Sequence, residues 1–117
     1  MRNGYRDKNI RNVPETIKRA LLNAAIAQSL TMADIAGAIL GERYGVIYYA
    51  TGRKSQRADV TSDQLTMSLP PEVIDAITRE ARVRRITESS AVLLTFAEYF
   101  GLMYTPTRRG RRLRGRA

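Results

Sequence analysis

The chain has 117 residues, of which 44% are hydrophobic, and its formal net charge is +9. It contains no cysteine and no histidine, so disulfides, thiolate zinc sites, cysteine nucleophiles and histidine general bases are excluded. The start lacks the apolar stretch of a signal peptide, and no apolar run approaches the roughly 20 residues of a membrane span. We therefore expect a cytoplasmic globular protein that is not an enzyme and uses no cofactor, metal, membrane or small-molecule substrate.

Residues 1–45 predict a short strand followed by two helices. Ile10 is the only large aliphatic side chain of the expected strand, and Pro14 suits the first turn of a helix. Apolar residues then recur at helical spacing, at Ile17, Leu21 and Ala24. A second helix is expected to open at Thr31, because "TMAD" has the threonine and acid spacing of a capping box.

Residues 46–63 are expected to form a linker with two different parts. The apolar start, "VIYY", could extend the preceding helix, cover the core or join a neighbouring molecule, and we favour core cover. The polar end carries three basic residues, Arg53, Lys54 and Arg57.

Residues 64–103 repeat the order of the first segment. In "LTMSL", residues 65–69, apolar and polar side chains alternate as in a half-buried strand. The "PPE" that follows suits the first turn of a helix, and apolar residues recur at helical spacing at Val73, Ile77 and Ala81. "TESS", which begins at Thr87, offers hydroxyl acceptors where a second helix would start.

Residues 104–117 form a tail with almost nothing to bury. Such a segment is expected to be disordered on its own, with a polyanion as its partner. Guanidinium groups pair bidentately with phosphate oxygens, which favours phosphate in particular. The tail contains no acidic residue and six arginines, Arg108, Arg109, Arg111, Arg112, Arg114 and Arg116.

The two parts of the chain are related by a shift of 56 residues. The shift aligns "NVPETIKRALLNAAIAQSLTMADIAGAIL" with "SLPPEVIDAITREARVRRITESSAVLLTF" without a gap. Each copy has only about 40 residues, too few for a sufficient core of its own, so the copies must share one core. We therefore expect a mainly α fold in which the two strands pair as a two-stranded antiparallel β-ribbon over four helices.

These segments resemble a known DNA-binding family. "LTMSLPPEVIDAITREA" followed by "ITESSAVLL" resembles a ribbon-helix-helix domain of the Arc/MetJ type, and "IRNVPETIKRAL" followed by "LTMADIAGAIL" resembles the variant common in antitoxins. The resemblance covers residues 8–45 and 64–101. It implies double-stranded DNA as the partner, with outward strand residues on base edges and the start of each second helix on phosphate.

The resemblance assigns base contact to the outward side of each strand. In the second copy the outward residues are Gln64, Thr66 and Ser68. The first copy departs from strict alternation and leaves two registers open. With Ile10 inward, the outward residues are Asn9 and Arg11; if Val13 sets the register, they are Lys8 and Asn12. We favour the first register, because a slip of one residue would expose Ile10.

Phosphate contacts are implied at the helix starts and in the basic segments. At the helix starts they fall on Thr31, Thr87 and Ser89, and in the linker on Arg53, Lys54 and Arg57. A third group fits phosphate contact and the helix dipole equally well, namely Arg82, Arg84 and Arg85. In the tail, Arg109-Gly110-Arg111 and Arg114-Gly115-Arg116 resemble the core of an AT-hook without its proline, so nonspecific phosphate contact is favoured over minor-groove insertion.

The second helices of the two copies differ in the size of their side chains. The first is small-surfaced, with Ala33, Ala36, Gly37 and Ala38, and the second is large-surfaced, with Leu93, Leu94, Phe96, Tyr99 and Phe100. Small against large packs better than small against small. We therefore expect the copies to pair with each other, so that one chain forms an asymmetric pseudo-dimer and its operator need not be palindromic.

The leading functional interpretation is a sequence-selective repressor of transcription that is associated with the nucleoid and could self-associate along DNA. Tandem copies also resemble relaxosome accessory proteins of conjugative plasmids and small phage regulators, so an architectural, DNA-bending protein is the first alternative. An antitoxin that represses its own operon is the second, although an arginine tail suits a nuclease active site poorly.

Overall fold

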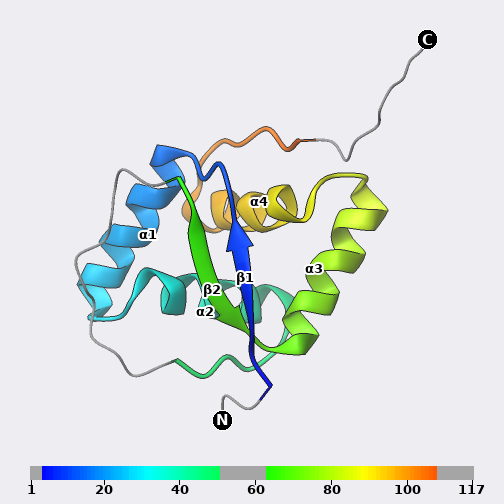
Figure 1. Ribbon diagram of the computed structural model, residues 1–117. Helices are drawn as coiled ribbons and strands as arrows, with labels where there is room; N and C mark the ends of the chain where they lie inside the picture. The colour runs from blue at the N-terminus through cyan, green and yellow to red at the C-terminus, as the bar shows by residue number, and fades with distance from the viewer. Residues whose placement is uncertain (1–3, 51–62, 108–117) are drawn as a thin grey trace.

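The computed structural model describes residues 4–50 and 63–107 of the chain (Figure 1). Within these residues the order of elements is strand, helix, helix, repeated once. We call residues 4–50 the first half and residues 63–107 the second half. The first half contains β1 (Arg6–Ile10), α1 (Glu15–Gln28) and α2 (Met32–Tyr44), and the second contains β2 (Leu65–Leu69), α3 (Pro71–Arg84) and α4 (Glu88–Phe100).

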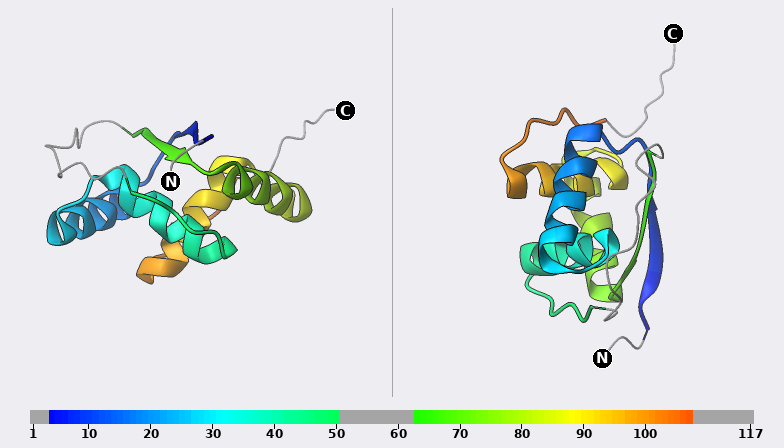
Figure 2. Two further views of the ribbon diagram at one scale, coloured as in Figure 1. Left: turned by 90° about the horizontal axis from the view of Figure 1, so that it is seen from below. Right: turned by 90° about the vertical axis from the view of Figure 1, so that its left-hand side faces the viewer.

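The two strands form an antiparallel ribbon, so the expected mainly α fold with a two-stranded antiparallel sheet is confirmed. The register sets Lys8 opposite Met67 in the middle of the ribbon, with Asn9 opposite Thr66 next to them. When the ribbon is seen edge-on, α1, α2, α3 and α4 all lie on one side of it (Figure 2, right). The described residues therefore leave its other face uncovered.

The inward side of the ribbon and the helices enclose one core. In Figure 1, α1 and α3 lie on opposite flanks of the ribbon, and α2 and α4 pass behind it. Large side chains from all six elements are fully buried, including Ile10, Leu21, Leu40, Met67, Ile77 and Phe96. Burial of this apolar surface, shared between the halves, is the dominant stabilising contribution to the fold.

The helix boundaries recur at the spacing of 56 residues and have local causes. Pro14 and Pro70 precede α1 and α3 with nearly the same backbone angles, φ −59° and −60°. Both of these helices end in a left-handed residue, Ser29 at φ 57° and Arg85 at φ 59°. Such a residue ends a helix because it turns the chain and lets the next amides reach the last carbonyls.

The strands do not follow the same spacing. Ile10 and Val13 are both buried, although they lie three residues apart, because Asn12 between them has a left-handed backbone at φ 58°. In the second half the corresponding buried residues, Met67 and Leu69, lie two apart. The ungapped alignment is therefore wrong in the strands, where the first half has one extra residue. The same left-handed turn resolves the two registers that the sequence left open. It allows both Ile10 and Val13 to be buried, so neither is turned outward.

After its second helix, each half runs back across that helix as a strap. We call residues 46–49 the first strap and residues 102–107 the second strap. In the first, the Tyr48 hydroxyl donates to Asp34 Oδ1 at 2.8 Å; in the second, the Tyr104 hydroxyl lies 3.1 Å from Ser90 Oγ. The packed part of the second half thus extends to Thr107, beyond the boundary expected at residue 103.

The interpretation of "VIYY" as a cover for the core holds for only part of the first strap. Val46 and Tyr48 pack against the core, whereas Ile47 is 71% exposed and Tyr49 is 47% exposed. Gly37 lies directly under the Tyr48 ring, where a Cβ atom would stand 2.3 Å from Cε1. At Gly37 the small side of α2 therefore receives its own strap.

In the part of the chain that the structure describes, no single helix is long and apolar enough to cross a membrane. Only α1 and α2 together reach that length, across a bend of 100°.

Candidate nucleic-acid interface

The open face of the ribbon carries short polar side chains. Because side chains alternate along a strand, burial of Ile10 and Met67 turns Asn9 and Thr66 to the outside, where both are exposed. These two residues lie opposite each other, and Thr66 Oγ1 donates to Asn9 Oδ1 at 3.0 Å. The structure thus brings together two of the residues that the sequence assigned to base contact, and it gives them a fixed mutual orientation.

The two ends of this face differ in charge. Arg11 follows β1 and Gln64 precedes β2, both exposed, and continuing the register by one pair would set them opposite each other. At the other end Asp7 lies opposite Ser68. The polar face is therefore basic at one end and acidic at the other.

Asp7 is an outward residue that the sequence analysis missed. It is exposed and occupies the same side of β1 as Asn9. The signal was present, because the alternation that turns Asn9 outward when Ile10 is buried also turns Asp7 outward. It was overlooked because the strand was expected to begin later in the chain.

Lys8 faces the helices, so the register that would have turned it outward is wrong. Its ammonium group forms an ion pair with Glu88 in the first turn of α4, and the side chains are 22% and 32% exposed. Thr78 Oγ1 donates to the other oxygen of the same carboxylate at 3.2 Å. A helix start favours a negative charge, and the long lysine stem can cover apolar surface while its charge reaches Glu88.

Thr31 and Thr87 cap the second helices, as expected. Thr31 Oγ1 accepts from the Asp34 amide, and Thr87 Oγ1 accepts from the Ser90 amide, each at 3.0 Å. The capped turns are half-buried, and Ser89 lies in the first turn of α4 beside its cap. Contact of these residues with phosphate stays a prediction.

The second strap occupies part of the start of α4. The Thr87 amide donates to the Thr107 carbonyl at 3.1 Å, and the Thr107 amide donates to Ser90 Oγ at 2.7 Å. Two donors near this helix start are therefore already bonded within the chain. Since Glu88 of the same turn pairs with Lys8 of β1, the strap ends close to the ribbon.

Most of the predicted basic contacts lie outside the described residues. These are Arg53, Lys54 and Arg57 of the linker and Arg108, Arg109, Arg111, Arg112, Arg114 and Arg116 of the tail. Of the remaining group, Arg84 Nε pairs with Glu80 Oε2 at 3.2 Å, and Arg82 and Arg85 are exposed at the end of α3. Their positions agree with the helix-dipole interpretation and leave phosphate contact as a prediction.

A second polar cluster joins α2 to α3. The Tyr44 hydroxyl donates to Glu80 Oε1 at 2.6 Å, and Arg43 Nη2 donates to Glu80 Oε2 at 2.8 Å. Burial raises the pKa of Tyr44 to about 12, with the hydrogen bond to Glu80 adding to it. Burial alone would raise the pKa of Glu80, but the bonds from Tyr44 and Arg43 outweigh it and hold this pKa below its ordinary value. The bond to Glu80 raises the pKa of Arg43.

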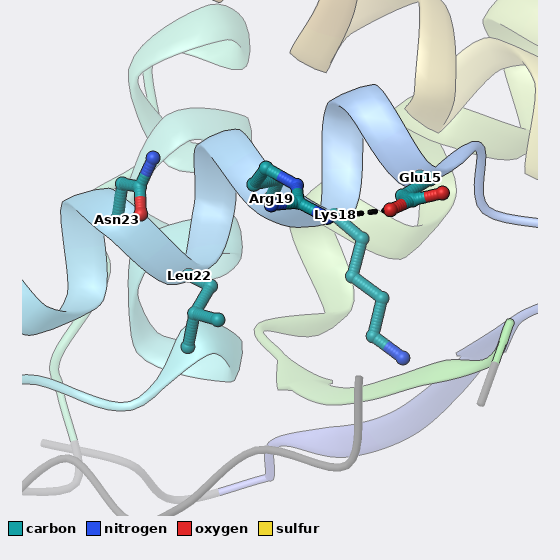
Figure 3. Close-up of a pocket in the computed structure, with 5 residues that line it drawn as sticks. All are labelled: Glu15, Lys18, Arg19, Leu22 and Asn23. Atoms are coloured by element: carbon teal, nitrogen blue, oxygen red, sulfur yellow. Dashed lines mark hydrogen bonds and ion pairs between the residues drawn. The ribbon is translucent and has the colours of Figure 1, made fainter. Parts of the chain in front are cut away.

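A shallow hollow runs along α1 on the flank of the fold (Figure 3). Arg19 Nη2 and Glu15 Oε2 pair there at 2.5 Å, while Lys18 is nearly buried and extends in the direction of the ribbon in this view. Leu22 and Asn23 complete the lining. The hollow combines both signs of charge with one large apolar side chain and lies apart from the open ribbon face, so we assign it no part in the site.

Among residues 4–50 and 63–107, no three acidic side chains gather into a group that could hold a metal ion. In comparisons with known proteins, no family model, curated protein or solved structure matches this chain. The resemblance to ribbon-helix-helix proteins therefore rests on the residues and geometry described above.

Proposed function

We propose that this chain is a sequence-selective, double-stranded DNA-binding protein of the ribbon-helix-helix kind that represses transcription in association with the nucleoid. In this proposal its two halves act as one pseudo-dimer, and the ribbon enters the major groove. A two-stranded ribbon is one of the few elements that this groove admits.

The observation that carries the proposal is the open polar face of the ribbon. All four helices lie on the other side (Figure 2), so nothing among the described residues prevents a duplex from meeting this face. Its side chains are polar, while Ile10, Leu65 and Met67 on the opposite face of the ribbon are buried.

The chemistry of the outward residues matches base edges. Arg11 can donate two hydrogen bonds to guanine, Gln64 and Asn9 can pair with adenine, and Thr66 can offer its methyl group to thymine. Asp7 can accept from the amino group of cytosine. The two ends of the ribbon would thus read different bases, which supports an asymmetric operator.

Electrostatics would add affinity at the sides of the ribbon. The second strap ends at the start of α4, so the arginine tail follows directly from a point beside the ribbon. Linker arginines and lysine follow the first strap in the same way. Contacts of this kind bind phosphate without reading sequence, and they weaken steeply as salt rises.

The proposal is tested by fluorescence anisotropy with a duplex from upstream of the gene and a shuffled duplex, across a salt series. We expect a preference for the native duplex that persists at physiological salt. Arg11→Ala with Gln64→Ala should abolish most of it, because each lost bidentate contact removes about 1–3 kcal/mol of discrimination.

Arg19→Ala with Asn23→Ala is the matched control, because it also removes one arginine and one amide but from α1. This control should leave the preference unchanged. Equal binding to both duplexes, lost together as salt rises, would contradict sequence reading and indicate the architectural alternative, which the arginine-rich tail favours.

A further inference from the structure

Two of the polar side-chain contacts between the halves have apolar residues at the equivalent positions of the repeat. The first contact is the ion pair of Lys8 with Glu88, which Thr78 also approaches. With the one-residue gap in the strands, Lys8 corresponds to Leu65, and Glu88 corresponds to Met32. Leu65 is buried and Met32 packs against the core. One side of the ribbon therefore carries an ion pair where the other side is apolar.

The second contact repeats this asymmetry at the other end of the helices. Tyr44 donates to Glu80 at 2.6 Å, and the side chain of Glu80 is only 16% exposed. By the shift of 56 residues, Tyr44 corresponds to Phe100, and Glu80 corresponds to Ala24. Phe100 and Ala24 both pack against the core. A phenol and a carboxylate in one place are thus matched by a phenyl ring and a methyl group in the other.

We propose that these two contacts make each half specific for the other half and reject pairing with a copy of itself. Two first halves would bring Lys8 to Met32 and leave the Tyr44 hydroxyl at Ala24. Two second halves would bring two carboxylates, Glu88 and Glu80, to Leu65 and Phe100. Each mismatch removes the contact that a half-buried charged or polar group makes with the other half, which is costly. Glu80 and Glu88 would keep their contacts within the second half, with Arg84 and Thr78, whereas the matched arrangement supplies both sets. Discrimination of this kind comes mainly from what the wrong pairing loses.

The inference concerns how the halves select a partner and does not require DNA binding, so the two proposals can fail independently. The chain contains no cysteine, which allows one engineered thiol to report the pairing. Asn9 and Thr66 lie opposite each other and hold equivalent positions in the two halves. A ribbon built from two first halves would therefore set Asn9 of one chain opposite Asn9 of another.

The experiment introduces Asn9→Cys into two backgrounds. One is the parent chain. The other, called the levelled variant, replaces both polar contacts by the apolar residues of the equivalent positions: Lys8→Leu, Tyr44→Phe, Glu80→Ala and Glu88→Met. Each full-length chain is unfolded, refolded at about 1 mM, so that a second chain competes with the millimolar effective concentration of the tethered partner, and oxidised with glutathione. Disulfide-linked dimers are counted on a non-reducing gel. Asn23→Cys on the exposed side of α1 reports random cross-linking in each background.

In the parent chain we expect no more dimer from Asn9→Cys than from Asn23→Cys. In the levelled variant, Asn9→Cys should give about tenfold more dimer than Asn23→Cys, because a loss of discrimination of 1.4 kcal/mol changes a ratio tenfold. The doubly substituted chain with Asn9→Cys and Thr66→Cys should close its disulfide within one molecule.

Abundant Asn9→Cys dimer in the parent chain would overturn the proposal, and so would a levelled variant that regains its helical circular dichroism without dimer. If the levelled variant does not fold, a charge exchange decides. Lys8→Glu alone should lower the melting temperature, and adding Glu88→Lys should restore part of the loss, although a lysine at the start of α4 opposes the helix dipole. Absence of that rescue would show that the pair does not select the partner.

Discussion

Glu80 is the residue on which the contact between α2 and α3 depends most directly. It accepts from Tyr44 and Arg43 and pairs with Arg84, so one carboxylate holds three side chains from two helices. The carboxylate is half-buried, and an unpaired half-buried carboxylate would be costly. Protonation of this group is therefore linked to stability, since its folded pKa is lowered. The contribution is present above the ordinary pKa of glutamate and is lost as pH falls through the folded value.

Tyr44 gives a sharper test, because its titration runs in the opposite sense. Its folded pKa is about 12 against an ordinary value of 10.0, so the folded state retains the phenolic proton longer than the unfolded chain does. The stability that Tyr44 contributes is complete below pH 10 and declines as pH rises from 10 towards 12. Tyr44→Phe should destabilise the chain by about 1–2 kcal/mol at pH 8, and urea unfolding should show this difference shrinking at pH 11. A difference that is constant between pH 8 and pH 11 would refute the linkage.

At the scale of elements, the two straps explain how short helices are held in place. Each strap lies back on the second helix of its own half and contains a tyrosine, Tyr48 or Tyr104, that reaches a residue in the first turn of that helix, Asp34 or Ser90. Asp34 is 1% exposed, so its carboxylate depends on partners such as Tyr48. Both straps thereby support the capped starts that the proposed function sets beside DNA.

Gly37→Ala tests the first strap. Alanine normally stabilises a helix by about 1 kcal/mol relative to glycine, but here the new Cβ would stand 2.3 Å from the Tyr48 ring. We expect a net destabilisation of about 1–3 kcal/mol as the ring is displaced. In a Tyr48→Ala background the same change should become neutral or stabilising, and thermal unfolding of the four chains measures the coupling. Stabilisation of the parent by Gly37→Ala would show that the strap does not lie where the structure places it.

At the scale of the whole molecule, most of the excess positive charge lies in residues 108–117, outside the residues that the structure describes. The tail holds six arginines, whereas the ribbon face has Asp7 at one end and Arg11 at the other. In the proposed function, base reading and nonspecific attraction therefore belong to different parts of the chain. They can be separated by truncation.

A chain that ends at Thr107 should keep the stability of the parent, because the second strap is complete. Its binding to any duplex should be weaker, and the slope of log affinity against log salt should fall by up to about 5, since six arginines are removed. A chain that ends at Gly101 also loses the strap and should melt several degrees lower. An unchanged salt slope after the first truncation would exclude the tail from DNA contact.

Local signals predicted the elements well, and contacts between distant residues explain the rest. Prolines and capping threonines marked the helix starts, and the small size of each copy predicted that the strands would pair. The left-handed turn at Asn12 could not be read from an asparagine alone, because that residue adopts several conformations. The partners of Lys8 and Tyr44 lie 80 and 36 residues away along the chain, so no local pattern identified them. For the interface, the fold confirms which side Asn9 and Thr66 occupy, while their contact with bases stays a prediction.

Because β1 and β2 belong to one polypeptide, the ribbon does not have to be assembled from two encounters in solution. A regulator that dimerises before binding responds to roughly the square of its abundance when it is scarce. Under the proposed function, a chain that folds its own ribbon would instead occupy its DNA site in direct proportion to the number of copies in the cell. Each molecule would then contribute the same amount of repression whether the protein is scarce or abundant. Repression would therefore rise gradually with expression and not at a threshold.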